Sequence, residues 1–204
     1  MNLSFQHASR RSRLVRTCQA GLMALALGLA LAAPAAMADP VATIDRSFSE
    51  YTGAGPIGND NLQDNNTVYW IYEGSGIWDG QSVDSWLLIW DPRALLTAKG
   101  SVSFDANILF FLDDQSELLA SAAFQKAGVS YDLTNAAVGL EASPDKANTS
   151  WGGSTVNFAW TASDPGDHVR VMTARVPEPG TLALVAASLL GLGLGGWSCR
   201  TPRQ

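Results

Sequence analysis

The chain has 204 residues and a formal net charge of −6, a length that suits one domain with a hydrophobic core and excludes two large ones. Between Asp39 and Arg175, seven lysines and arginines stand against eighteen aspartates and glutamates. Such an acidic body would repel phosphate backbones, so we expect no nucleic-acid partner.

Residues 1–38 have the pattern of a cleavable secretory signal peptide. Four arginines precede the apolar stretch GLMALALGLALAAP, and the small residues Ala36 and Ala38 then form an A-x-A site before Asp39. A charged start, a short apolar middle and a small-residue end are the three parts of such a signal; an uncleaved membrane anchor is the alternative. The paired arginines of SRRSRL also occur in twin-arginine signals, but Arg13 stands where those carry a bulky apolar residue. The sequence therefore does not decide between the general secretory route and the twin-arginine route.

The body begins with a polar, Gly- and Asn-rich segment, 53–66, which predicts a loop. Its oxygen donors, and those of the later segment DPGDH, are of the type that calcium prefers. Neither matches the spacing of a twelve-residue calcium loop with its terminal glutamate. We therefore predict no metal site and no cofactor, with calcium as the alternative. The donors concerned are Asn59, Asp60, Asn61, Asp64, Asp164 and Asp167.

Aromatic and branched residues at 67–73 and 85–91 predict two strands joined by a loop, 74–84. Every even position from Val102 to Leu112 is apolar, which predicts one strand with a buried face. The segment 116–128 predicts the one helix, with Leu118, Leu119, Ala122 and Ala123 on its apolar face.

Near the end of the body, two alternating runs, 154–162 and 168–174, flank the turn residues Pro165 and Gly166, which predicts a hairpin. Its apolar faces would carry Val156, Phe158 and Trp160 on one strand and Val169 and Val171 on the other. Many short strands without a repeated βαβ pattern favour an all-β fold. We predict an antiparallel β-sandwich or jelly-roll-like domain over 39–175.

Six tryptophans lie in this body, and most are expected to fill the core. Trp78 and Trp151 stand beside glycines in expected loops, so they are the candidates for stacking on a sugar ring. Catalysis is not expected. The single body histidine, His168, follows a turn and is expected at the surface rather than beside a nucleophile. Asp113 with Asp114, or Asp91 with Glu73, are the only pairs considered for a glycosidase.

The chain ends with a short apolar run, 182–197, between a proline-rich segment and a basic end. At about 1.5 Å per residue, this run and the two residues before it barely span a bilayer. Arg200 and Arg203 favour the cytoplasmic side for that end. Pro177 and Pro179 prevent the helix from continuing backwards into the body. The sequence predicts a tail of three parts, 176–181, 182–197 and 198–204.

This tail, VPEPGTLALVAASLLGLGLGGWSCRTPR, resembles the PEP-CTERM sorting tail of Gram-negative bacteria. The resemblance covers about the last 29 residues and implies recognition by an exosortase, a membrane enzyme that processes such tails. Pro177, Glu178 and Pro179 would be its recognition residues. Cys199 could be modified. An ordinary membrane anchor with an accidental PEP triplet is the alternative.

The resemblance implies an exported, membrane-tethered protein that is then released to the cell surface or a biofilm matrix. The body is expected to have a structural or interaction role. A carbohydrate-binding module for exopolysaccharide is the alternative, and a secreted glycosidase is a third reading.

Overall fold

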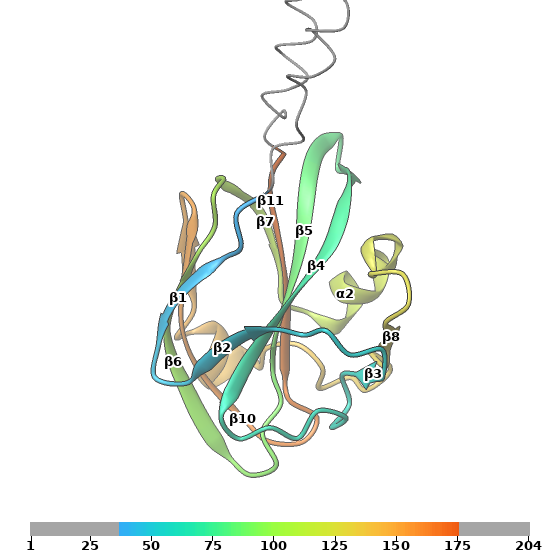
Figure 1. Cartoon of the computed structure of the whole chain (residues 1–204). Helices are drawn as coiled ribbons and strands as arrows, with labels where there is room; N and C mark the ends of the chain where they lie inside the picture. Colours follow the sequence, from blue (N-terminus) through green and yellow to red (C-terminus); the bar gives the residue numbers. More distant parts are fainter. Residues whose placement is uncertain (1–36, 176–204) are drawn as a thin grey trace, which may run out of the picture. The chain divides into compact units, whose positions relative to one another are not determined.

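Two β-sheets face each other across a hydrophobic core in the computed structural model, which describes residues 37–175 (Figure 1). In spatial order, the four-stranded sheet contains β1 (Val41–Ile44), β6 (Leu96–Ser103), β10 (Thr155–Ala162) and β9 (Ser150–Gly152). The five-stranded sheet contains β2 (Ser47–Glu50), β4 (Thr67–Trp78), β5 (Gln81–Trp90), β11 (Asp167–Ala174) and β7 (Ile108–Leu112). The remaining elements are β3 (Pro56–Ile57), β8 (Ser130–Tyr131), α2 (Gln115–Ala120), the 3-10 turn η1 (Ala122–Phe124) and the π-helical η2 (Ala142–Lys146). The predicted all-β, sandwich-like character is confirmed, but the pairing is not antiparallel throughout, because β2 pairs with β4 and β3 pairs with β8 in parallel.

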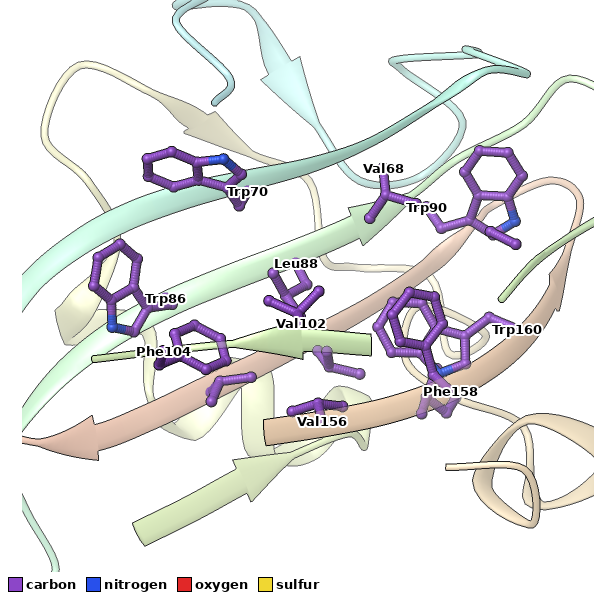
Figure 2. Close-up of a cluster of buried hydrophobic side chains, with 14 of the residues drawn as sticks. Val68, Trp70, Trp86, Leu88, Trp90, Val102, Phe104, Val156, Phe158 and Trp160 are labelled. Carbon is purple, nitrogen blue, oxygen red and sulfur yellow. The ribbon is translucent and has the colours of Figure 1, made fainter. Parts of the chain in front are cut away.

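Alternating side chains fill the space between the sheets. In β10, Val156, Phe158 and Trp160 are buried, as predicted, while Asn157 is exposed. Figure 2 shows them beside the tryptophans of β4 and β5. Burial of each large apolar side chain contributes roughly 1.5–3 kcal/mol. Four of the six body tryptophans are core residues, as expected: Trp70, Trp86, Trp90 and Trp160.

A third layer covers the outer face of the five-stranded sheet. Ile71 of β4 and Leu87 and Ile89 of β5 pack there against Leu118 of α2 and Leu133. As a result β11, which pairs with β5 and β7, is buried on both faces. We expected the residues between its valines to face solvent; that was wrong, because sequence alternation does not reveal the covering layer.

The predicted hairpin of 154–174 is also wrong. Both strands exist, but β10 pairs with β6 and β9, whereas β11 pairs with β5 and β7. The connection 163–166 therefore crosses from one sheet to the other. Gly166 has φ +82°, and a Cβ there would lie 2.8 Å from the Cα of Asp91. A side chain there would therefore force the backbone at Trp90 and Asp91 to shift.

Two further boundaries differ from the predictions. The single strand expected at 101–112 is divided into β6 and β7, which lie in different sheets. The loop expected at 74–84 is strand instead, because β4 and β5 continue to a two-residue turn at Asp79 and Gly80, with φ of 45° and 75°. An Asp-Gly pair with positive φ at both positions is the preferred turn of a tight hairpin.

The helix is shorter than predicted. It begins after Asp114, whose side chain forms a capping box with Glu117, and ends at Ala120. Its buried face carries Leu118, and the 3-10 turn that follows buries Phe124. Leu119 is exposed instead.

Within residues 37–175, no helix is long and apolar enough to cross a membrane. The predicted signal peptide and sorting tail lie outside the described residues, as do Pro177, Glu178, Pro179, Cys199, Arg200 and Arg203.

Candidate functional site

Trp151 lies in the edge strand β9 rather than in a loop, and its side chain is 46% exposed. It pairs in register with Val156, a core residue of β10, so it points toward the other sheet. There it stacks on Phe111 of β7, with ring centroids 6.1 Å apart and planes at 21°. β9 is one edge strand of the four-stranded sheet, and β7 is one edge strand of the five-stranded sheet. The pair therefore closes one side of the sandwich and leaves part of the indole ring accessible.

Trp78 is the last residue of β4 and is half-buried. Its ring meets that of Phe124 edge-on, at 6.3 Å between centroids, in a cluster that includes Phe110. Phe110 and Phe111 are neighbours in β7 and point to opposite faces of the sheet. Trp78 and Trp151 thus lie on opposite sides of the five-stranded sheet, and the structure does not bring them together as one platform.

The carboxylate pairs considered for a glycosidase are not arranged for one. Ser85 donates a hydrogen bond to Glu73, at 2.7 Å between oxygens, and Asp91 lies six residues further along from Ser85. At roughly 3.3 Å per residue this is about 20 Å, well beyond the separation of about 5–10 Å that glycosidases use. Asp113 and Asp114 both accept from Nζ of Lys146, at 2.9 and 2.7 Å.

Glu73 instead forms a buried ion pair with Arg170 of β11. Nε of Arg170 lies 2.5 Å from Oε2 of Glu73, and Nη2 lies 2.7 Å from Oε1. The guanidinium also donates to the carbonyl oxygen of Leu118, at 2.9 Å, and to the hydroxyl of Ser121. Sequence reasoning missed this network, because Arg170 sits at an expected surface position. Its partners hold α2 against the sheet.

His168 is fully buried, so the expected surface position was wrong. Its side chain shares the outer face of the sheet with that of Arg170, two residues along β11. Burial lowers the pKa of His168 to about 4 from 6.5. Nδ1 lies 3.3 Å from the carbonyl oxygen of Gly166, and Nε2 has no hydrogen-bond partner among the described residues. A neutral imidazole in this position fills space in the covered layer.

The loop residues considered for calcium are engaged in hydrogen bonds with other residues of the protein. Asn59 donates to Asp132, at 3.2 Å, and Gln63 donates to Asp60, at 2.7 Å. Asp64 accepts from the hydroxyl of Tyr69, at 2.8 Å. These contacts shape the loop itself.

A different group of carboxylates gathers where the two sheets connect. Glu141, Asp145 and Asp167 each place an oxygen within 4.8 Å of those of the other two. Burial, Asp145 and Glu141 together raise the pKa of Asp167 to about 9. Of the residues considered for calcium, only Asp167 belongs to this group. The only sequence feature that pointed to this group was the spacing of Glu141 and Asp145, which are four residues apart. Nothing in the sequence indicated that β11, which carries Asp167, lies beside η2.

A scan against family models, a search of curated proteins and a search of solved structures each find no match to this chain.

Proposed function

We propose that this chain is an exported protein whose C-terminal tail is recognised by an exosortase, and which then serves at the cell surface or in the matrix. The observation that carries the proposal is the order of features at the C-terminus: a Pro-Glu-Pro triplet, an apolar run and a basic end, in a chain that also starts like a signal peptide. The body is proposed to be a β-sandwich or jelly-roll ectodomain.

The position of the strands supports this division of the chain. β1 begins at Val41 and β11 ends at Ala174, so the strands that the structure describes within residues 37–175 all lie between the expected cleavage site and the PEP triplet. These strands pair with one another, so removing both end segments would leave the pairings among them intact.

Both ends of the folded body lie close together. Val41 pairs with Ser103 at the end of β6, and the N–H of Ala174 donates to the carbonyl oxygen of Asn107, at 2.7 Å. Ser103 and Asn107 flank one short connection. Because residues 41 and 174 lie on the same side of the domain, the opposite side is free for other contacts, as a tethered ectodomain requires.

The test compares wild-type cells with cells making the variant Pro177→Ala, Glu178→Ala, Pro179→Ala. After fractionation, the C-terminus of each product is determined by mass spectrometry. We expect a shortened C-terminus and surface or released protein in the wild type, and a full-length, membrane-held product in the variant. Pro202→Ala, which changes a tail proline outside the triplet, is the matched control and should be processed normally. An intact tail in the wild type would overturn the sorting proposal and leave a plain membrane anchor.

A second candidate role for the body is binding of exopolysaccharide, favoured by the accessible indole of Trp151. A half-exposed ring that is already stacked on Phe111 is held in place, so it loses little freedom when a sugar stacks on it. A glycosidase role is not proposed. Asp91 and Glu73 lie too far apart for one, and Asp113 and Asp114 are paired with Lys146.

Tryptophan fluorescence during titration with the host's exopolysaccharide tests this role. We expect Trp151→Ala to weaken binding by about tenfold, since stacking of this kind contributes about 1 kcal/mol or more. Leu119→Ala is the control, because Leu119 is also 46% exposed but has no aromatic ring. Equal binding by both variants would exclude Trp151 as the contact.

A further inference from the structure

A cavity of about 360 Å³ opens where the chain crosses between the sheets, and it is lined by the three clustered carboxylates. Glu141 directly precedes η2, Asp145 lies within η2, and Asp167 is the first residue of β11. Asp164, in the crossing itself, lines the same cavity. Acidic groups from two separate parts of the chain thus converge on one space.

Two of these carboxylates are buried without enough partners. Asp145 and Asp167 are each 1% exposed. One oxygen of Asp145 accepts the N–H of Thr161 in β10, at 2.7 Å. The second oxygen of Asp145 and one oxygen of Asp167 are buried and have no hydrogen-bond partner among the described residues. An ionised carboxylate buried in this way costs several kcal/mol unless a positive charge compensates it.

No side chain in the described part of the chain supplies that charge. None of the ion pairs formed there involves Glu141, Asp145 or Asp167. Lys146 follows Asp145 directly in sequence, but its ammonium group contacts Asp113 and Asp114 instead. The compensating charge must therefore be a proton or an ion from solution.

We propose that Glu141, Asp145 and Asp167 bind a divalent cation of the calcium type. Three carboxylates can supply three to six oxygen ligands, and calcium accepts six to eight, with water filling the rest. The cavity has room for such water molecules. The group contains no histidine or cysteine, so it does not suit zinc or copper.

The bound ion would join elements of both sheets. Asp167 begins β11 of the five-stranded sheet, and Asp145 is hydrogen-bonded to Thr161 of β10 in the four-stranded sheet. An ion held between them would fix the crossing 163–166, which no hairpin pairing holds. Calcium would then stabilise the junction of the sandwich, and this inference does not depend on the proposed sorting.

The experiment uses the purified full chain in detergent, freed of metal with EGTA. Calorimetric titration with Ca²⁺ should show one site with a Kd of about 10⁻⁵–10⁻³ M, and the melting temperature should rise with Ca²⁺ and fall again with EGTA. Asp167→Asn and Asp145→Asn should lose both effects. Absence of binding heat and of a thermal shift in the wild type would overturn the proposal.

Two further variants keep the result interpretable. Glu141→Gln changes an exposed ligand and should fold normally, yet weaken Ca²⁺ binding at least tenfold. Asp113→Asn changes a carboxylate that Lys146 already neutralises, and should bind Ca²⁺ like the wild type. The proposal fails if Asp113→Asn and Asp167→Asn behave alike, and the calcium assignment fails if Mg²⁺ or Zn²⁺ binds more tightly than Ca²⁺.

Discussion

Asp167 and Arg170 lie three residues apart in β11, on opposite faces of the same sheet, and both are buried. Arg170 meets a carboxylate, a hydroxyl and a backbone carbonyl oxygen. Asp167 meets two other acids. Arg170 on the covered outer face thus has a complete set of polar partners, whereas Asp167 on the inner face does not. The buried charge of Arg170 is paired within the protein, whereas the buried carboxyl of Asp167 must take up a proton or a cation from solution.

The completed network should give the largest effect when it is broken. Arg170→Met leaves Glu73 buried without a cation, and such changes usually cost about 3–5 kcal/mol. We expect a loss of that size in the free energy of unfolding, measured by chemical denaturation. The double variant Arg170→Met, Glu73→Leu removes both charges and should recover part of the loss. A loss below about 1 kcal/mol in the single variant would show that the ion pair is not an essential part of the covered face.

A smaller loss in the free energy of unfolding is expected from Gly166→Ala. This change affects the crossing next to Asp167 and leaves the Arg170 network intact. A Cβ at Gly166 meets the backbone of Asp91 at 2.8 Å, and φ is +82°. The two penalties together should cost roughly 2–3 kcal/mol. Because the change moves the start of β11, the thermal response to Ca²⁺ should also shrink.

Gly128→Ala provides the matched control for this variant. Gly128 has φ +85°, and a Cβ there meets nothing within 4 Å, so only the backbone penalty of about 1–2 kcal/mol applies. The response to Ca²⁺ should not change. Equal losses in the two glycine variants would contradict the close approach of the crossing to β5.

The same contrast explains what the sequence could predict. Period-two patterns identified β10 and its core residues, because burial on one face leaves an alternating trace in the sequence. They failed for β11, where the covering layer of α2 and its neighbours buries His168 and Arg170 as well. Sheet partners were also out of reach, since the turn residues before β11 suit a crossing as well as a hairpin.

Of the predicted ligand-binding tryptophans, Trp151 remains accessible, and Trp78 belongs to a packed cluster with Phe124. Of the three clustered carboxylates, only Asp167 was identified from the sequence as a candidate ligand. The convergence of η2 with β11 depends on tertiary contacts between residues about twenty positions apart, and no local pattern encodes it.

Asp91 is an intermediate case between Asp167 and Arg170, because it is buried and only half satisfied. One of its oxygens accepts the N–H of Leu62, at 2.9 Å, and the other has no partner among the described residues. Burial, with a contribution from the charges of Asp60 and Asp164, raises the pKa of Asp91 to about 6 from 3.8. Between these pH values the folded state binds a proton that the unfolded chain releases. This carboxyl therefore lowers stability progressively as pH rises from about 4 to about 6.

Asp91→Asn should remove this dependence while keeping an oxygen for Leu62. We expect the variant to be about 1–2 kcal/mol more stable than the wild type at pH 7, less than the full linkage of about 1.4 kcal/mol per pKa unit, because the new amide N–H₂ also needs partners. As pH falls the advantage should shrink and then reverse, leaving the variant about 1 kcal/mol less stable than the wild type near pH 4, because the cost of the amide does not depend on pH. Chemical denaturation at pH 4, 5, 6 and 7 measures the difference, and comparison at equal pH cancels the opposite contribution of His168, whose lowered pKa favours unfolding as pH falls below 6.5. If the difference in the free energy of unfolding between the two proteins stays constant from pH 4 to pH 7, Asp91 has an ordinary pKa. The buried carboxylate would then stay ionised with a hydrogen bond to only one of its oxygens.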